Sequence, residues 1–412
     1  MTPSGPAPGR LLVVTSNYPR WAGDSTTPFV ADLTRSLVDR GWEADVLAPH
    51  APGAARDEEL AGIPVHRFRY LLPERAQTVC YQGGALVNLR QNRSNLLKLP
   101  ALVGAEWATV VRRLRTGAYD AVHAHWVLPQ GLVGVLATRT VPVVVTVHGG
   151  DVFALDQGPL RAAKRFAFGR AAAVTVNSSA TERAVLDLTR PRRLERIPMG
   201  IDIDPVVDPA TVDRLRAEHR SGDGPLLALV GRVVAEKGVF DLLDAVDRLR
   251  ADLPEVRAVV LGEGQDRLAA EARAAELGLG DHVSFVGWID PADVSAWLRA
   301  ADVVVAPSRT APDGWAEAQG LSIVEAMAAR RPVVASDSGG IGDAVEHEVT
   351  GLVVGEGRPD QLADAVRRLH ADPTLAARVA EAGRARAVER FSADASADAF
   401  SALFTDLIGR RP

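Results

Sequence analysis

Two glutamates separated by seven residues in a glycine-containing segment have side chains suited to sugar and phosphate chemistry. Glu317 and Glu325 lie in GWAEAQGLSIVEAMAA, residues 314–329, on either side of Gly320 and Leu321. A helical pattern begins at Ser322, after this Gly-Leu step. The free N–H groups of a helix start favour anions, phosphate above all. Carboxylate oxygens accept hydrogen bonds from sugar hydroxyls. The segment is therefore suited to hold a phosphate and a polyol together.

A purely structural role is the alternative for the same residues. Ser322 and Glu325 fit a capping box, in which the two side chains satisfy backbone N–H groups at the start of their own helix. Glu317 would then be an ordinary loop carboxylate. The segment alone does not decide between these interpretations, so the other loops of the chain must.

A basic pair flanks a second loop, GRVVAEKG at residues 231–238, between an expected strand and an expected helix. Arg232 offers a planar fork of donors and Lys237 a compact charge, so the pair suits two phosphates. Two further glycine-rich loops follow expected strands: Gly262-Glu263-Gly264, whose glycines would allow the close approach of a ligand, and residues 337–340 (DSGG). Their recurrence at successive strand ends indicates a binding edge rather than unrelated turns.

Two histidines follow neighbouring expected strands in the first half of the chain. His125 and Trp126 follow one strand, and His148 follows the next, just before Gly-Gly-Asp151. Imidazole donates or accepts hydrogen bonds near neutral pH, which suits hydroxyl recognition or acid–base chemistry. The pairing favours a site over two isolated structural histidines.

Strands alternating with helices must position all of these residues. This order predicts parallel sheets covered on both faces, and such sheets bind ligands at the carboxyl ends of their strands. The strands are expected at residues 11–15, 43–48, 64–69, 121–124, 143–146 and 173–177, and then at 226–230, 257–261, 282–286, 303–306, 332–335 and 352–354.

The length of 412 residues predicts two domains of about 200 residues each. Three prolines and a glycine in residues 196–209 mark the linker between them. We expect an N-terminal domain at 1–198 and a C-terminal domain at 199–392, to which the family resemblance given below assigns acceptor binding and donor binding. The remainder, 393–412, is expected to form an amphipathic helix that packs back toward the first domain.

Several classes of protein are not indicated by the composition. The chain has no run of about 18 apolar residues for a membrane span, and its start, MTPSGPAPGR, lacks the apolar core of a signal peptide. Its single cysteine, Cys80, fits a reducing compartment. Together with the missing signal peptide, this predicts a cytoplasmic location. The histidines are scattered and no thiolates are paired, so we expect no metal site.

Positive charge is concentrated in residues 66–115, which contain nine Arg or Lys residues but only two acidic ones, Glu74 and Glu106. The resulting net charge of +7 contrasts with -5 for the whole chain. An anionic partner is one interpretation, either the inner face of the cell membrane or a lipid-phosphate acceptor. A solvated face of a loop-rich insertion is the other. No nucleic-acid partner is expected.

Together the motifs resemble those of the retaining glycosyltransferases of family 4. The resemblance extends over nearly the whole chain and rests on VTVHGGDV (145–152), GRVVAEKG, GEG, the two spaced glutamates with EAMAA, PVVASDSGG (332–340) and TGLVV (350–354). It implies the GT-B architecture, an α/β fold of two Rossmann-like parallel-sheet domains that face each other across a deep cleft.

The resemblance also implies roles for the donor-binding residues. Glu325 would bind the ribose hydroxyls and Glu317 the hydroxyls of the donor sugar. The backbone at Gly320-Leu321 would help to hold the diphosphate. The other residues implied on this side are Arg232 and Lys237 on the pyrophosphate, with the Gly262-Glu263 loop nearby.

Residues of the first domain are implied on the sugar side. His148 resembles the histidine that touches the sugar near the reacting carbon, and Gly23 the loop that closes on the phosphates. The family usually has two adjacent glycines there, whereas this chain has Ala22-Gly23. Candidates on the acceptor or sugar side are His125, Trp126 and Asp151, and the catalytic set is His148, Glu317, Arg232 and Lys237.

The implied reaction moves a hexosyl unit from a nucleotide-diphosphate sugar, with UDP as the expected nucleotide, to a hydroxyl acceptor by same-face substitution. No metal or cofactor is expected. A non-hydrolysing nucleotide-sugar epimerase of the same fold is the main alternative. A phosphorylase-like enzyme would need a lysine for pyridoxal phosphate, but the chain has only three lysines and one of them is assigned to phosphate. A binding module without catalysis would not need both carboxylates and the basic pair.

Overall fold

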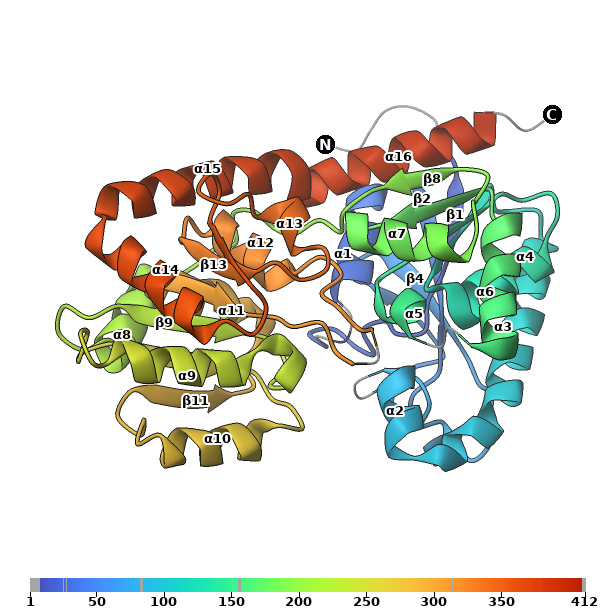
Figure 1. The fold of residues 1–412 in the computed structure, drawn as a ribbon. Coiled ribbons are helices and arrows are strands. Elements are labelled where there is room, and N and C mark those ends of the chain that lie inside the picture. The colour runs from blue at the N-terminus through green and yellow to red at the C-terminus, as the bar shows by residue number, and fades with distance from the viewer. Residues whose placement is uncertain are drawn as a thin grey trace. The chain divides into compact units, whose positions relative to one another are not determined.

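The computed structural model describes residues 8–24, 26, 28–81, 84–154, 157–312 and 314–409. The chain forms two compact units (Figure 1). Unit 1 comprises residues 1–200 together with 393–412, and unit 2 comprises residues 201–392. The division lies two residues after the predicted boundary at 198. Each unit is an α/β domain with its own sheet, as the alternation of strands and helices predicts.

The sheet of unit 1 has eight strands in the order β3-β4-β2-β1-β5-β6-β7-β8. All neighbours are parallel except β3 and β4. Two strands were not predicted, β3 and β8, because the first is a polar edge strand and the second is only three residues long. The bounds are β1 Arg10–Val14, β2 Glu43–Pro49, β3 Asp57–Leu60, β4 Ile63–Phe68, β5 Ala121–His125, β6 Val143–Thr146, β7 Ala173–Val176 and β8 Leu194–Arg196.

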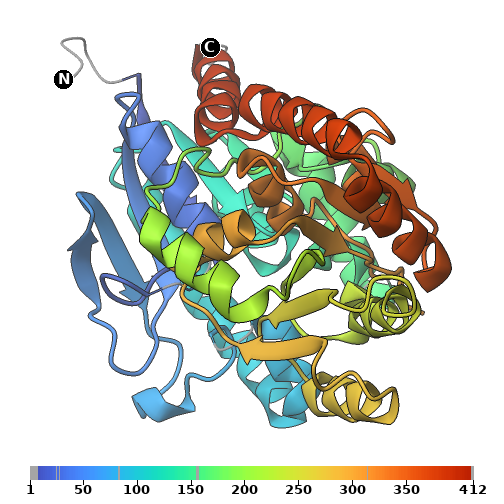
Figure 2. The same cartoon turned by 90° about the vertical axis from the view of Figure 1, so that its left-hand side faces the viewer.

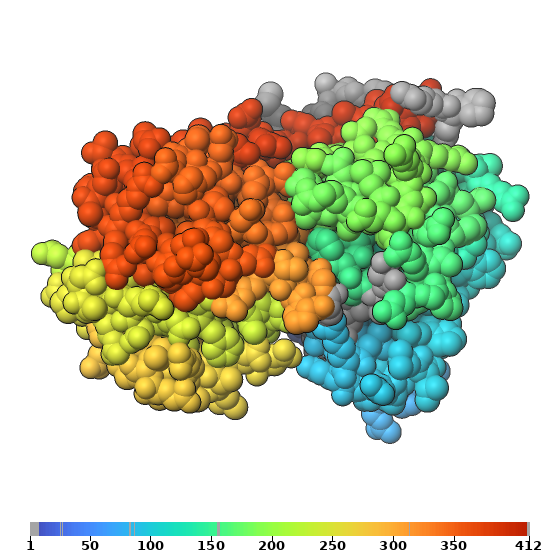
Figure 3. Space-filling view, in the orientation of Figure 1, coloured from blue at the N-terminus to red at the C-terminus, as the bar shows by residue number. Residues whose placement is uncertain are grey.

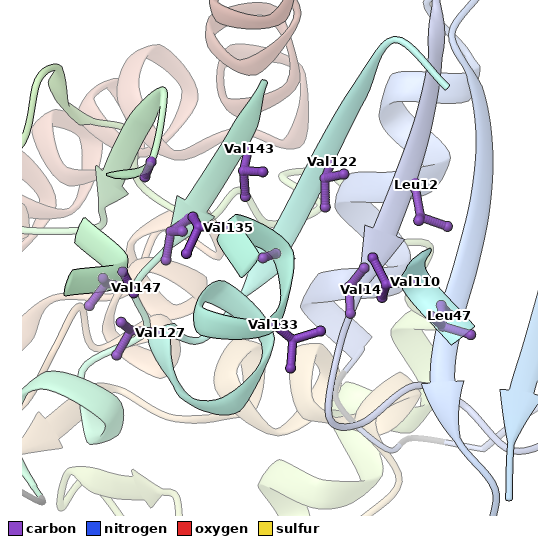
Figure 4. Close-up of a cluster of buried hydrophobic side chains, with 14 of the residues drawn as sticks. Leu12, Val14, Leu47, Val110, Val122, Val127, Val133, Val135, Val143 and Val147 are labelled. Atoms are coloured by element: carbon purple, nitrogen blue, oxygen red, sulfur yellow. The ribbon is translucent and has the colours of Figure 1, made fainter. Parts of the chain in front are cut away.

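Apolar side chains on the strands and covering helices form the core of unit 1 (Figure 4). Leu12, Val14, Val122 and Val145 have no exposed surface. β-Branched residues suit this setting because their stiff side chains pack well on a pleated sheet. The helices are α1 Pro28–Val38, α2 Ala85–Gln91, α3 Leu99–Leu114, α4 Leu132–Ala137, α5 Gly150–Phe153, α6 Gly158–Arg170, α7 Ser179–Leu188 and α16 Ala393–Gly409, with shorter turns η1 Glu74–Ala76, η2 Arg93–Lys98 and η3 Val127–Gly131.

Unit 2 contains a parallel sheet of six strands in the order β11-β10-β9-β12-β13-β14. Its strands are β9 Leu226–Val230, β10 Arg257–Leu261, β11 Val283–Gly287, β12 Val303–Ala306, β13 Val333–Ser336 and β14 Leu352–Val354. Its helices are α8 Pro209–His219, η4 Ala235–Lys237, α9 Val239–Leu249, α10 Arg267–Glu276, α11 Pro291–Ala300, α12 Leu321–Ala328, α13 Ile341–Ala344, α14 Pro359–Ala371 and α15 Pro373–Phe391.

The last helix, α16, belongs to unit 1 although α15 directly before it belongs to unit 2. It packs against α1 (Figure 2), and its Ser401 accepts a hydrogen bond of 2.9 Å from the Trp42 indole. Arg40 pairs with Asp394 at 3.0 Å. The chain therefore returns to the first unit after completing the second, as predicted.

Candidate active site

Four loops of unit 2 meet at one edge of its sheet. The strands β10, β9, β12 and β13 are parallel neighbours, so the loops that follow their carboxyl ends are adjacent. The direction of chain progression reverses between β9 and β12, since β10 and β11 extend to one side and β13 and β14 to the other. Open parallel sheets bind ligands at such a switch point.

An ion pair joins the two loops on either side of this switch point. Lys237, at the end of η4, donates a hydrogen bond from Nζ to Oε2 of Glu317, in the loop after β12. The two side chains are only 20% and 11% exposed, so solvent screens their attraction less than on an open surface. The Lys237 ammonium also lies 5.7 Å from the centre of the Trp315 ring. Sequence reasoning found the two charged residues but not their contact or Trp315.

The loop after β13 seats the backbone of Glu317. The Gly340 N–H donates to the Glu317 carbonyl at 2.7 Å. A β-carbon on Gly339 would lie 2.1 Å from that carbonyl oxygen, and the φ of Gly339 is +57°. Both the space and the backbone conformation therefore require glycine here.

The glycines after β9 and β10 also serve close contacts within the protein. A β-carbon on Gly262 would lie 2.0 Å from the Gly231 carbonyl oxygen, and one on Gly264 would lie 2.1 Å from that of Val233. The predicted close approach is thus between two loops, which the glycines allow to pack together. The side chain of Glu263 is exposed and pairs with Arg267.

A second ion pair, not predicted from the sequence, holds the same edge together. Arg309, after β12, donates to both carboxylate oxygens of Asp241 in α9. The backbone N–H of Arg309 also donates to the Glu236 carbonyl at 2.8 Å. The loops after β9 and β12 are thereby joined through backbone and side chains.

Helix α12 begins at Leu321, with Gly320 as its N-cap at a φ of +74°. No side chain caps this helix, and Ser322 lies inside it, so the capping-box alternative for Glu325 is wrong. Among the described residues, the N–H groups of Leu321 and Ser322 have no hydrogen-bond acceptor. Burial raises the pKa of the half-buried Glu325. Both the helix start and Glu325 are thus available to a ligand.

Arg232 and Lys237 are differently placed although the sequence suggests one basic pair. Lys237 contacts Glu317, whereas the exposed Arg232 guanidinium has no ion-pair partner in the part of the chain that the structure describes. Arg232 is therefore free to reach an anion, and Lys237 must exchange a partner to do so.

Two aromatic side chains lie beside the predicted sugar-side residue of unit 1, His148. The ring of His148, after β6, lies 4.8 Å from that of Trp126, after β5, and 5.0 Å from that of Phe29, in α1. These loops adjoin the switch point of this sheet, which lies between β1 and β5. Phe29 was not predicted as a site residue. The sequence feature that could have indicated it is its position at the start of a helix, directly after a glycine-containing loop.

His125 and Asp151 lie inside unit 1 rather than at its surface. His125 has no exposed surface, and its Nδ1 lies 3.0 Å from Nε2 of His148, so its contact is with that ring and not with solvent. The carboxylate of Asp151 accepts hydrogen bonds from the N–H groups of Val127 (2.9 Å) and His148 (3.1 Å). Asp151 therefore positions the backbone of His148, and neither residue is placed for the expected direct contact.

Gly23 lies in the loop after β1 with a φ of +85°, where glycine is favoured. Arg20 and Asp24 close this loop with an ion pair of 2.7 Å. No atom of the described residues lies within 4 Å of the position a β-carbon would take at Gly23. The glycine is thus required by its backbone conformation and not by crowding.

Comparison with known proteins agrees with this geometry. Residues 27–205 match the family described as Glycosyltransferase Family 4, and residues 212–386 match Glycosyl transferases group 1. The chain is 31% identical over 437 residues to a D-inositol 3-phosphate glycosyltransferase of Xylanimonas cellulosilytica, covering 99% of this chain and 98% of that protein. It is 28% identical over 385 residues to a GDP-mannose-dependent alpha-(1-6)-phosphatidylinositol monomannoside mannosyltransferase of Mycobacterium tuberculosis, covering 91% and 92%.

A solved structure shows the same fold. Sucrose-phosphate synthase from Thermosynechococcus elongatus superimposes with a TM-score of 0.77 at 23% identity, covering 97% of this chain and 99% of that one. The chain belongs to glycosyltransferase family 4 and has the GT-B fold. It is accordingly a glycosyltransferase that uses a nucleotide sugar.

Proposed function

We propose that this glycosyltransferase transfers a hexosyl unit from a nucleotide-diphosphate sugar to a hydroxyl acceptor with retention of anomeric configuration. The Lys237–Glu317 ion pair at the switch point of unit 2 carries this proposal. It places a cation for a diphosphate and a carboxylate for sugar hydroxyls side by side, where parallel sheets bind ligands. Glu325 serves the ribose hydroxyls, and the free N–H groups of α12 serve a phosphate.

Breaking the bond between sugar and diphosphate builds negative charge on the leaving phosphate. Arg232, Lys237 and the start of α12 oppose this charge, and such preorganised groups are commonly the largest catalytic contribution. We propose that these groups suffice without a metal ion or cofactor. Transfer should therefore survive prolonged treatment with EDTA. If EDTA abolished turnover and added metal ions restored it, this part of the proposal would be contradicted.

The proposed substitution takes place on one face of the sugar. The bond from the anomeric carbon to the diphosphate oxygen breaks, the acceptor oxygen bonds to that carbon on the same face, and the acceptor proton passes to the departing phosphate. Double displacement would instead need a free carboxylate nucleophile, whereas Glu317 is engaged by Lys237. Proton NMR of the product formed from an α-linked donor should show an α linkage.

UDP is the nucleotide that we propose, although the M. tuberculosis relative is named for GDP-mannose. A thermal-shift panel of UDP and GDP sugars decides between them. A ligand present at ~100 times its dissociation constant adds about 2.7 kcal/mol to stability. If GDP-mannose stabilised the protein and no UDP sugar did, GDP would replace UDP as the proposed nucleotide.

Turnover tests the reaction class. We expect acceptor-dependent release of nucleotide when the enzyme is given donor with D-inositol 3-phosphate or phosphatidylinositol monomannoside, the compounds in the names of the two relatives. Glu317→Gln and Lys237→Met should each lower turnover about 100-fold or more. Arg273→Met removes an ion pair on the surface of the same unit and is the matched control. Isomerised donor without acceptor would favour the epimerase instead.

Some charged residues of the basic stretch 66–115 are paired, buried or uncharged in the folded protein. Arg67 is buried and pairs with Glu58, and Arg69 pairs with Glu74. Burial raises the pKa of Glu106 to about 8, so this residue is protonated at neutral pH and offsets no charge. Exposed cations remain, among them Arg75 in η1 and Arg93 in η2.

Exposed leucines accompany these cations. Leu96 and Leu97 in η2 are 51% and 85% exposed, and Arg93 and Lys98 begin and end the same turn. Lys98 and Asn95 both bond to Thr78, at 2.9 and 2.8 Å, which fixes η2 to the preceding loop. Residues 85–98 form part of the surface of unit 1, cyan in Figure 3. Leucines between basic residues are typical of segments that lie on anionic membranes.

We propose that η2 docks this enzyme on the cytoplasmic face of an anionic membrane. In the part of the chain that the structure describes, no helix has the length and apolar character to cross a bilayer. Sedimentation with vesicles containing phosphatidylglycerol should exceed that with phosphatidylcholine alone and should fall with salt. Leu97→Ser should weaken it, whereas Leu268→Ser, at an 80% exposed leucine of unit 2, should not. Equal sedimentation with both vesicles would contradict the proposal.

A further inference from the structure

Three imidazole rings form a row inside unit 1. His123 and His125 are two residues apart in β5, so their side chains share one face of the sheet. Their ring centres are 4.2 Å apart, and the His125 ring stacks on that of His148 at 5.2 Å with an interplanar angle of 14°. Of these three rings, only that of His148 belongs to the catalytic set predicted from the sequence. The other two need a separate explanation.

All three rings are uncharged at neutral pH. His123 and His125 are 1% and 0% exposed, and burial lowers the pKa of His123 to about 3 and that of His125 well below its ordinary value. Burial also lowers the pKa of His148. Each ring therefore carries one N–H, and the hydrogen bonds decide which nitrogen holds it.

The contact between His125 and His148 can be satisfied in two ways. Either His125 Nδ1–H donates to His148 Nε2, or His148 Nε2–H donates to His125 Nδ1, across the same 3.0 Å. The second arrangement leaves the proton of His125 on Nε2, which is buried and has no partner among the described residues. A buried N–H without an acceptor is costly and rarer than an unpaired acceptor. The first arrangement is therefore the favoured one.

We propose that His125 is a positioning residue that donates from Nδ1–H to His148 Nε2 and holds His148 in the tautomer with its proton on Nδ1. This inference rests on the proposed sugar-side role of His148. Nδ1 of His148 has no hydrogen-bond partner among the described residues, and its ring is partly exposed. His148 thus presents an uncharged hydrogen-bond donor to a substrate oxygen, and it cannot act as a base through Nε2.

The surrounding contacts keep this arrangement in place. His123 Nε2 lies 2.7 Å from the Thr146 hydroxyl, which lies 2.7 Å from that of Thr175. Behind His123, the rings of Phe400 and Phe404 in α16 lie 5.1 and 5.2 Å away. The returning C-terminal helix therefore contacts the histidine row at His123.

The tautomer itself can be measured without substrate. Long-range proton–nitrogen NMR correlations of protein labelled with nitrogen-15 histidine distinguish a proton on Nδ1 from one on Nε2. The His148 signals are assigned by their loss in His148→Gln. We expect His148 to be uncharged with its proton on Nδ1 at pH 7. A proton on Nε2, or a charged ring, would overturn the proposal.

Two substitutions of His125 separate positioning from packing. An asparagine side chain can place an N–H where His125 has Nδ1, whereas leucine fills the space and donates nothing. His125→Leu should shift the His148 proton away from Nδ1 and lower kcat at least about tenfold with little change in KM. His125→Asn should recover the tautomer and most of kcat. Packing alone predicts the opposite order, because leucine fills a buried site better than asparagine.

The control removes another buried histidine of unit 1. His50 is 1% exposed and bonds to Ala54 and Gln77, so His50→Leu should leave the His148 tautomer unchanged. Failure of the proposed function would appear as absent transfer by the wild type, whatever the tautomer. This inference would be wrong if His125→Leu and His125→Asn changed the kcat of transfer to the same extent.

Discussion

Glu106→Gln is expected to stabilise unit 1, and increasingly so as the pH rises. Glu106 lies in α3 with 0% exposure, and neither carboxyl oxygen has a hydrogen-bond partner among the described residues. Burial raises its pKa from 4.5 to about 8, while the nearby Gln130 amide opposes the shift without reaching hydrogen-bond geometry. Glutamine has nearly the shape of the protonated acid and does not ionise.

The size of the effect follows from the two pKa values. Between pH 4.5 and 8 the unfolded chain has lost a proton that the folded chain keeps, so stability falls as the pH rises. One pH unit corresponds to about 1.36 kcal/mol, which sets an upper bound of ~5 kcal/mol above pH 8. Glu106→Gln removes this loss. The variant and the wild type should therefore be similar at pH 5 and differ by several kcal/mol at pH 8.5.

Urea unfolding at the two pH values measures the difference, and hydrogen exchange in peptides from α3 assigns it to unit 1. Glu74→Gln is the matched control, because Glu74 is 38% exposed and pairs with Arg69. It should show no gain that grows with pH. If Glu106→Gln gains less than about 1 kcal/mol between pH 5 and 8.5, Glu106 is ionised in the folded protein and the reasoning from burial is refuted.

Three further predictions concern the edge of unit 2. Gly339→Ala should lower kcat/KM about 100-fold with the circular dichroism spectrum unchanged, because its β-carbon would lie 2.1 Å from the Glu317 carbonyl oxygen. Gly280→Ala, at a position where the described part of the chain places no atom within 4 Å of the new β-carbon, should retain normal kinetics, and equal losses in both variants would count against the packing argument. Glu317→Gln should bind UDP at least as tightly as the wild type by calorimetry, since it removes a negative charge and frees Lys237; weaker binding would show that the ion pair orients Lys237 for the nucleotide. Arg232→Ala should weaken UDP binding but leave uridine binding unchanged, and an unchanged Kd for UDP would remove Arg232 from the phosphate site.

The alternation of strands and helices was sufficient to predict two parallel sheets, because buried parallel strands appear as short β-branched runs. β3 could not be found in this way. Its sequence, DEEL, is polar because it is an edge strand, and its pairing with β4 depends on a chain reversal rather than on apolar side chains. The boundaries of the core strands were predictable, whereas the edges of the sheet were not.

The chemistry of the loops was predictable by residue type, but their contacts were not. The glycines at 262 and 264 suggested close approach of a ligand, and the structure shows close approach of another loop. Steric demand at a glycine is the same whether the neighbour is phosphate or backbone, so the sequence cannot distinguish the two. The capping box was also wrong. It requires Ser322 as the N-cap, whereas the N-cap is Gly320, two residues earlier.

The sequence by itself determined the fold class and the set of charged residues at the strand ends, because both follow from local patterns. Tertiary structure decided which of these residues meet. Lys237 and Glu317 are 80 residues apart and come together only because β9 and β12 are neighbours. His125 and His148 were both predicted at the ends of neighbouring strands, yet one is buried and the other partly exposed. Burial depends on the whole packed unit, and burial sets the charge and the hydrogen-bonding role of each ring.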